Sequence, residues 1–140
     1  MLDKVFTANG RLVLRADAIF DAVLGCILLA ATWDDLYEAL DLPHAEPEVF
    51  TQMAGGLLIA YSYLLWIAPT NRFLAIQMAL LTGIVNVVAV VLLAVWLSSG
   101  ELNIGDFGSI LLNVISAVLA VLAALELGLF RRLTAETEED

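Results

Sequence analysis

Four long apolar runs dominate this sequence and constrain its fold more than any other feature. They cover approximately residues 12–33, 50–68, 73–97 and 107–130. The hydrocarbon core of a lipid bilayer is about 30 Å thick, and an α-helix crosses it in roughly 20 residues. Strands of a membrane barrel alternate in polarity over about ten residues, whereas these runs are continuously apolar. The runs therefore predict an all-α, polytopic membrane protein with a bundle of four transmembrane helices.

The composition of the 140-residue chain agrees with this class and excludes others. Hydrophobic residues make up 61% of the chain, charged residues 16%, and the mean hydropathy is +0.92, which is too apolar for an ordinary soluble domain. The net charge is −10, and the six Lys and Arg form no basic stripe, so nucleic acid is excluded as a partner. The single cysteine, Cys26, forms no intrachain disulfide and no Cys/His metal set. We expect no metal site and no cofactor.

The positions of the basic residues predict how the helices are oriented. All six lie at one end of the predicted helices, and the loops 34–49 and 98–106 contain none. They are Lys4, Arg11, Arg15, Arg72, Arg131 and Arg132. Because cytoplasmic loops are enriched in Lys and Arg, we expect both termini in the cytoplasm. The predicted parts are an N-terminal segment 1–11, a transmembrane domain 12–132 and an acidic, disordered tail 133–140.

The first loop without basic residues is predicted to carry a short amphipathic helix. Its apolar set has helical spacing and is ended by Leu42-Pro43. The set consists of Trp33, Leu36, Tyr37 and Leu40. The same loop holds six carboxylates and His44, in an order that does not match a calcium-binding loop. A solvated acidic face is therefore favoured over a cation site.

Polar residues inside the predicted spans are the main functional candidates. An ionisable side chain at the centre of a membrane helix costs about 2.5 to 3.5 kcal/mol on insertion scales. All four predicted helices place polar residues in their cytoplasmic third. The candidate cluster consists of Arg15, Asp17, Asp21, Tyr61, Tyr63, Gln77 and Glu126. Asp17 and Asp21 lie one helical turn apart, so we expect both carboxylates on the face toward the bundle interior.

Two interpretations of this cluster stay open. In the structural interpretation, Arg15 or a tyrosine hydroxyl pairs with Asp21 or Glu126 and locks the helices together. In the functional interpretation, Asp17, Asp21 and Glu126 line a vestibule open to the cytoplasm, which binds a proton, a cation or a small polar solute. The outer halves of the helices offer no second charged site, and this favours the structural interpretation.

A further set of residues is predicted to pack the helices together. Asn86 and Asn113 fall at comparable depth in the outer half, where their amides are expected to hydrogen bond across the helices. A stripe of small residues with four-residue spacing, which allows a second backbone to approach closely, runs along the last helix. It consists of Ser116, Ala120, Ala124 and Gly128. Its partner is either another subunit or a similar stripe of the first helix, formed by Ala18, Ala22, Cys26 and Ala30. Gly55 and Gly56 are expected to allow another close approach.

Three parts of the chain carry a resemblance to a known kind of protein. They are the segment RLVLRADAIFDAVLG at residues 11–25, the segment GGLLIAY at residues 55–61, and Asn86. In helix number, in the acidic residue early in the first helix and in the glycine-containing start of the second, the chain resembles uncharacterised four-helix bacterial membrane proteins of the DoxX-like type. The resemblance implies a location in the bacterial inner membrane and supplies no catalytic residues.

Catalytic templates are absent from the sequence. It contains no glycine-rich phosphate loop, no His-Glu-x-x-His pair and no Gly-x-Ser-x-Gly turn, so we expect a protein that is not an enzyme. The favoured function is that of an accessory or assembly subunit, which packs in the lipid bilayer against a larger membrane complex or against a second copy of itself. The alternative is a small transporter or channel subunit for a proton, a cation or a small polar solute, which uses Asp17, Asp21 and Glu126.

Overall fold

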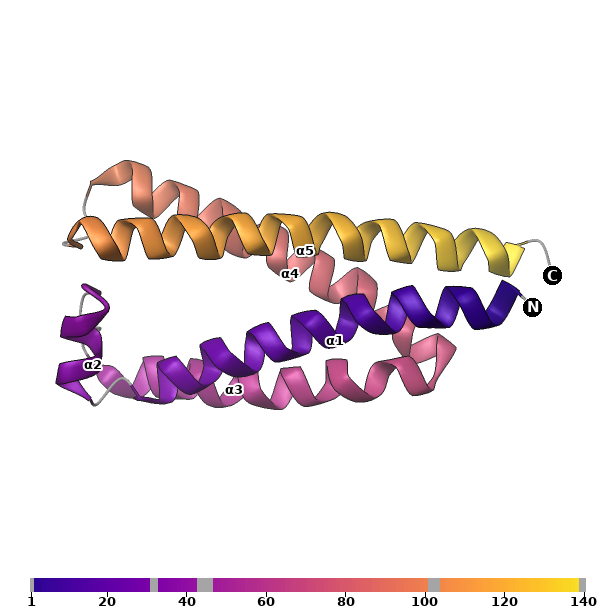
Figure 1. Ribbon diagram of the computed structural model, residues 1–140, viewed down its shortest axis with the longest axis horizontal. Helices are drawn as coiled ribbons and strands as arrows, with labels where there is room; N and C mark the ends of the chain where they lie inside the picture. The colour runs from indigo at the N-terminus through magenta and orange to yellow at the C-terminus, as the bar shows by residue number, and fades with distance from the viewer. Residues whose placement is uncertain (1, 31–32, 43–46, 101–103, 139–140) are drawn as a thin grey trace.

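The fold of the described residues is helical throughout, as predicted. The computed structural model describes the backbone of residues 2–30, 33–42, 47–100 and 104–138, and side chains within these ranges from Asn9 to Ala135. The long helices are α1 (Leu2–Leu29), α3 (Glu48–Ile67), α4 (Arg72–Ser99) and α5 (Asp106–Glu138), and the short ones are α2 (Asp34–Ala39) and the 3-10 turn η2 (Ala68–Thr70). Figure 1 shows that the two termini lie at the same end of the molecule.

Three of the described helices are long and apolar enough to cross a membrane. They cover Glu48–Thr70, Arg72–Ser99 and Asp106–Ala135. Large apolar side chains are exposed along all of them, for example Leu57 and Val91, as expected where helices face lipid. These helices indicate a membrane protein. The remaining long helix, α1, has 28 residues but carries charged side chains in its apolar part.

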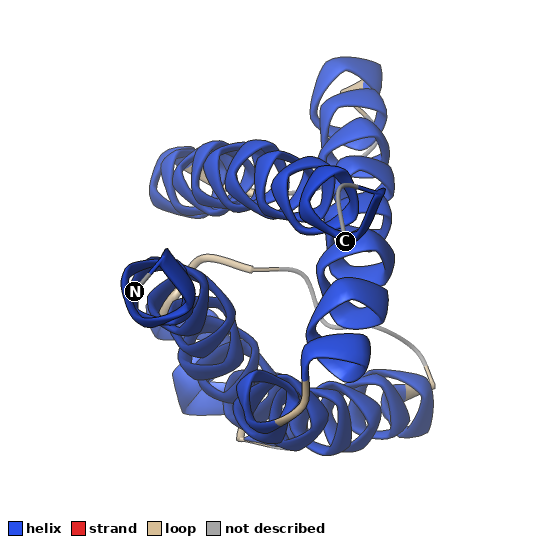
Figure 2. Cartoon of the chain, turned by 90° about the vertical axis from the view of Figure 1, so that its right-hand side faces the viewer, coloured by secondary structure: helices blue, strands red, loops and turns tan. Residues whose placement is uncertain are grey.

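The long helices pack as two pairs. α1 lies along α3 and α4 lies along α5, whereas α1 and α5 meet over a much shorter stretch. Figures 1 and 2 show α4 crossing from the α3 side of the molecule to the α5 side. The turn into α4 is fixed by Asn71, whose Oδ1 accepts hydrogen bonds from the backbone N–H of Phe73 at 2.9 Å and of Leu74 at 3.3 Å. This is an N-cap, which satisfies donors that have no partner within the helix.

The helices of the first pair approach each other closely at Gly25 of α1 and Gly55 of α3. A Cβ atom added at Gly55 would lie 2.7 Å from the carbonyl oxygen of Gly25 and 2.8 Å from the amide nitrogen of Leu29. Gly55 thus has the packing role that was predicted for it. Gly56 does not, because an added Cβ there would meet no atom of the described residues within 4 Å.

Two predicted boundaries are wrong. The first helix begins at Leu2, so that the segment 1–11 is not separate from it, and the last helix continues to Glu138 through residues predicted to be disordered. Leu129 and Leu133 explain the second difference, because both are buried in the apolar core and hold the end of α5 against it. Extending an existing helix also adds one hydrogen bond for each residue that is fixed.

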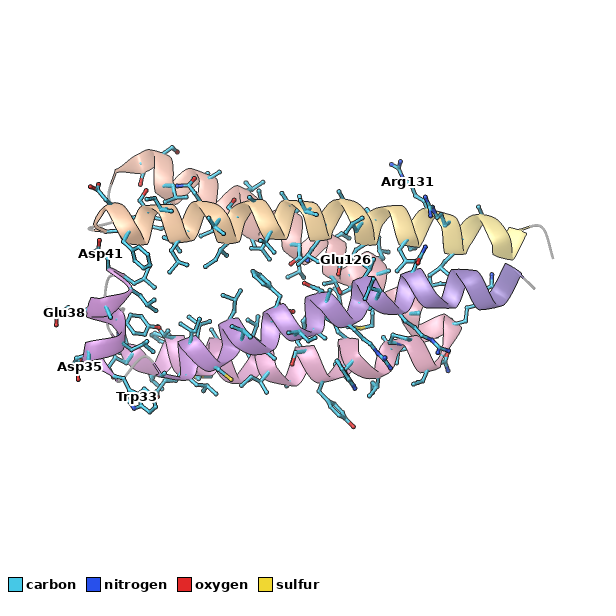
Figure 3. The ribbon with its side chains drawn as sticks, viewed as in Figure 1. Trp33, Asp35, Glu38, Asp41, Glu126 and Arg131 are labelled. Carbon is cyan, nitrogen blue, oxygen red and sulfur yellow. The ribbon has the colours of Figure 1, made fainter. Side chains whose placement is uncertain are left out.

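The amphipathic helix predicted for the first loop is present as α2. Its Tyr37 is buried, and Trp33 before it is exposed; the predicted candidate His44 lies outside the described residues. After α2, Asp41 adopts a left-handed backbone conformation with φ of 55°. The Asp41 backbone lies so close to Gly108 that a side chain at Gly108 would overlap it. The segment after α2 therefore contacts the start of α5 at the end opposite the termini (Figure 3).

Candidate functional site

Polar side chains from all four long helices gather in the interior of the molecule. This buried polar cluster consists of Asp17 and Asp21 from α1, Tyr61 from α3, Thr82 and Asn86 from α4, and Glu126 from α5. Figure 3 shows Glu126 on the side of α5 that faces the other helices, whereas Arg131 points away from them. The cluster thus joins the two helix pairs.

The cluster is almost completely removed from the surface. Asp17, Thr82 and Glu126 have an exposed fraction of 0%, and that of Asp21 is 5%. Each of these groups is flanked along its helix by apolar residues. Burial of a polar group in such surroundings is unfavourable unless the group is hydrogen-bonded, and burial of an unpaired charge is more so. The hydrogen bonds of the cluster therefore decide what it can do.

Two side-chain hydrogen bonds connect helices within the cluster. Asn86 Nδ2 donates to Glu126 Oε2 at 3.0 Å, which links α4 to α5. The hydroxyl groups of Tyr61 and Thr82 lie 2.9 Å apart and link α3 to α4. Because Thr82 Oγ1 donates its proton to the carbonyl oxygen of Met78 at 2.6 Å, the Tyr61 hydroxyl is the donor to Thr82.

The carboxylates of the cluster keep open acceptor positions. Both oxygens of Asp17 and the Oε1 atom of Glu126 are buried without a hydrogen-bond partner among the described residues. Asp17 nevertheless lies close to Glu126 and Asn86, and Asp21 adjoins it on the next turn of α1. Two neighbouring carboxylates with open acceptor positions repel each other and attract a proton or a cation. The described residues include no group of His, Cys, Asp or Glu arranged to hold a metal ion.

Three of the predicted cluster residues do not belong to it. Arg15, Tyr63 and Gln77 are exposed, and the Arg15 guanidinium lies 5.0 Å from the centre of the Trp66 ring in a cation–π contact. Helix geometry explains the first two cases. Arg15 is two residues before Asp17 and Tyr63 is two residues after Tyr61, which turns each about 200° around its helix from the cluster residue.

The predicted partners of the carboxylates are therefore wrong. Neither the Arg15 guanidinium nor a tyrosine hydroxyl is the partner of Glu126, which accepts its hydrogen bond from Asn86. The Tyr61 hydroxyl is bonded to Thr82 instead of to a carboxylate. Side-chain hydrogen bonds still connect the helices, as in the structural interpretation, but the donors are Asn86 for Glu126 and Tyr61 for Thr82.

The predicted pairing of Asn86 with Asn113 is also wrong. Asn113 is exposed, and its Nδ2 atom donates to the carbonyl oxygen of Ser109 at 2.8 Å. Asn86 lies 14 residues, or about 21 Å, from the start of α4. Because α4 runs obliquely, this part of the helix reaches Glu126 of α5. A signal for Asn86 and Thr82 was present in the sequence, because they lie four residues apart on one face. Asp17 and Asp21 have the same spacing.

The small-residue stripe of the last helix does not pack within the chain. Ala120 and Ala124 are exposed, and a Cβ atom added at Gly128 would meet no atom of the described residues within 4 Å. The predicted pairing with the stripe of the first helix is wrong, because α5 turns a different face to α4. On that face, Leu127 lies against Gly83 of α4. Ser116, at the other end of the stripe, is half-buried.

Comparisons with known proteins found no match. No family model matches the chain, and neither a curated protein nor a solved structure does. The DoxX-like resemblance therefore stays a prediction, and any functional assignment rests on the buried polar cluster.

Proposed function

We propose that this chain is a four-span integral membrane protein of the bacterial inner membrane, with both termini in the cytoplasm. Three apolar helices support this topology, and so does α1, whose 28 residues correspond to about 42 Å. The charged residues Asp17 and Asp21 of α1 are buried against other helices and do not face lipid. Arg15 lies beside Trp66, and tryptophan is common at membrane interfaces. The distribution of Lys and Arg supports the orientation.

The function that we propose is the binding and release of a proton by Asp17 and Glu126, in a small transporter or channel subunit. One observation carries this proposal: Asp17 is fully buried beside Glu126, and among the described residues neither of its oxygens has a hydrogen-bond partner. A proton between an Asp17 oxygen and Glu126 Oε1 replaces two repelling acceptors by one O–H···O hydrogen bond. Asn86 holds Glu126 in position through Oε2.

The groups around this pair favour a positive ligand over a negative one. The titratable groups that face it are Asp21 of α1 and Tyr61 of α3, and α4 contributes the neutral side chains of Asn86 and Thr82. Carboxylates in a medium of low dielectric constant attract cations and repel anions strongly. We assign the pair to a proton, because one proton between an Asp17 oxygen and Glu126 Oε1 satisfies open acceptor positions on both carboxylates.

Proton binding can be tested on purified protein in lipid vesicles. Infrared spectra recorded at decreasing pH are expected to show the carbonyl band of a buried, protonated carboxyl group. Asp17→Asn and Glu126→Gln are each expected to remove this band, because each variant lacks one half of the pair. Asp35→Asn is the matched control, since Asp35 is an exposed carboxylate on α2. The same band in the wild type and in Asp17→Asn would refute the proposal.

Proton movement can be measured separately from proton binding. Vesicles that enclose a pH-sensitive dye are exposed to a pH step, and wild-type protein is expected to accelerate the internal pH change. Asp17→Asn and Glu126→Gln are expected to return the rate to that of vesicles without protein, while Asp35→Asn behaves as the wild type. A wild-type rate equal to that of empty vesicles, tested with and without small polar solutes, would contradict the transport part of the proposal.

The exposed stripe on α5 favours a second candidate function, that of an accessory or assembly subunit. Ala120 and Ala124 face away from α4 and are open to a partner helix. We expect Ala124→Leu to release a stoichiometric partner, or a second copy of the chain, from complexes extracted in mild detergent. Val121→Leu, at an exposed position beside the stripe, is the control. An intact mass equal to one chain in the wild type would exclude this function.

A further inference from the structure

The apolar core of the chain lies on one side of the buried polar cluster. On each long helix, the core residues are displaced from the cluster residues toward the end that holds the termini. They are Leu14 on α1, Leu65 and Ala68 on α3, Met78 and Ala79 on α4, and Leu129 and Leu133 on α5, with Ala18 beside Asp17. Because protein interiors are packed as densely as organic crystals and leave few voids for water, this core separates the cluster from the terminal end.

The opposite side of the cluster is packed differently. On α1 the buried apolar side chains of the described residues, Leu14 and Ala18, both precede Asp21. Those of α3 all follow Tyr61, and those of α4 all precede Thr82. On α5, by contrast, the buried residues Leu119, Leu122 and Ala123 precede Glu126, so this one helix carries buried apolar side chains beyond the cluster. They do not belong to the apolar core that the long helices share at the terminal end, and α1 and α5 meet over only a short stretch. Among the described residues, the shared core therefore does not extend to this side.

Asp21 lies on the side that lacks the core. It is one helical turn farther from the N-terminus than Asp17, on the same face of α1, and the two carboxylates interact. Its exposed fraction is 5%, compared with 0% for Asp17 and for Glu126. The next turn of α1 carries Leu24, which is half-buried. Asp21 is thus the carboxylate of the cluster that is closest to the end opposite the termini.

We propose that Asp17 and Glu126 exchange their proton with the side of the membrane opposite the termini, and that Asp21 relays it. This inference rests on the proposed function. In the loading step, the carboxylic acid of Asp21 transfers its proton to the carboxylate of Asp17, which then shares it with Glu126. The Asp21 carboxylate that remains takes up the next proton from water on the same side. Release runs through the same transfers in reverse.

In the functional interpretation of the cluster, the vestibule was open to the cytoplasm; here the route leads to the opposite side. With the termini in the cytoplasm, the proton exchanges with the outer face, because the apolar core closes the route to the cytoplasm. The orphaned oxygens of Asp17 and Glu126 supply the acceptors at the inner end of this route. In this route, Asp21 acts on the rate at which the proton arrives.

The test is a rapid pH step applied to one side of vesicles in which the protein has a single orientation. The infrared band of the protonated pair is followed in time. A step on the side opposite the termini is expected to give the fast response. Asp21→Asn is expected to slow that response by about 100-fold, with the final amplitude unchanged, because the relay affects rate and not capacity. Asp21→Glu is expected to restore the rate, and Asp35→Asn is the matched control.

The outcomes separate the relay from the proposed function. A normal rate in Asp21→Asn, or a faster response to a step on the terminal side, overturns the relay while the band and its loss in Asp17→Asn still support proton binding. Absence of the band in the wild type overturns both. A reduced final amplitude in Asp21→Asn also overturns the relay, since it would place Asp21 in the binding pair itself.

Cysteine labelling provides a measurement that does not change the carboxylates. In a Cys26→Ser background, Leu24→Cys is expected to react with a charged, membrane-impermeant thiol reagent added on the side opposite the termini. Val23→Cys is the matched control, because Val23 is 53% exposed on the surface of α1 that we assign to lipid, where a thiol stays unreactive toward such a reagent. Reaction of Leu24→Cys from the terminal side, or from neither side, would overturn the proposed route.

Discussion

A methyl group added at Gly55 is expected to have the opposite effect on stability from one added at Gly56. In Gly55→Ala the new Cβ would lie 2.7 Å from the carbonyl oxygen of Gly25 and 2.8 Å from the amide nitrogen of Leu29. Non-bonded heavy atoms are most stable at about 3.5–4.0 Å, so α1 and α3 must separate by about 0.7 to 1.3 Å to reach that distance. These are backbone atoms of a helix, which cannot move aside by a change of rotamer.

The size of the two effects follows from this geometry. Overpacking a close-packed contact costs about 1–3 kcal/mol, whereas Ala in place of Gly stabilises a helix by about 0.5–1 kcal/mol. The net loss in Gly55→Ala is therefore about 0–2.5 kcal/mol. Gly56→Ala has the helical gain alone, because an added Cβ there meets no atom of the described residues within 4 Å.

Reversible unfolding of the purified protein in mixed micelles, with increasing sodium dodecyl sulfate and helical circular dichroism as the signal, measures both free energies. The two variants share the host helix and the added atom, so that the difference between them isolates the contact with α1. Equal stability of Gly55→Ala and Gly56→Ala would show that the backbones of α1 and α3 are not in close contact at Gly55. Gly25→Ala is expected to lose stability like Gly55→Ala, because its Cβ would lie 2.9 Å from the carbonyl oxygen of Gly55.

Other positions lead to further expectations, which the same unfolding assay can measure. Asn86→Leu leaves Glu126 without its donor and is expected to destabilise the chain by about 1–3 kcal/mol. Asn113→Leu, at an exposed position bonded to its own helix, is expected to change stability by less than about 0.5 kcal/mol; similar losses in both variants would contradict this. Gly108→Ala is expected to release the segment after α2 from α5 and to increase its cleavage by a protease added on that side. Burial raises the pKa of the Tyr37 phenol above its ordinary value of 10.0. Its contribution to stability is therefore complete below pH 10 and is lost as the pH rises through the raised pKa. Tyr37→Phe is expected to remove this alkaline loss.

The helical class of the chain followed from the sequence because it depends on properties that add up along the chain. Apolar runs longer than the bilayer is thick permit only helices or closed barrels, and the continuous apolar pattern excludes barrel strands. The apolar spacing around Tyr37 predicted α2 for a similar local reason. The ends of the helices were predicted less well. Leu2 and Glu138 are included because a helix continues wherever nothing interrupts it.

The buried carboxylates were predicted as a group, but their surroundings were not. Asp17, Asp21, Tyr61 and Glu126 do come together, as their positions in the same third of the predicted spans indicate. Arg15 and Tyr63 were included on depth alone, although each lies two residues from a cluster residue and hence on the far side of its helix. Residues at a similar depth in the membrane can thus point to opposite sides of their helix.

The helical class, the apolar spans and the acidic character of the interior site follow from the amino-acid sequence alone, because each depends on residue type and on spacing along one helix. Which side chains meet depends on how the helices pack. The oblique crossing of α4 brings Asn86 to Glu126 instead of to Asn113, and the packing of the four long helices places the shared apolar core on the terminal side of the cluster. Crossing angles depend on how surfaces of different helices fit together, and periodicity along a single helix carries no information about this fit.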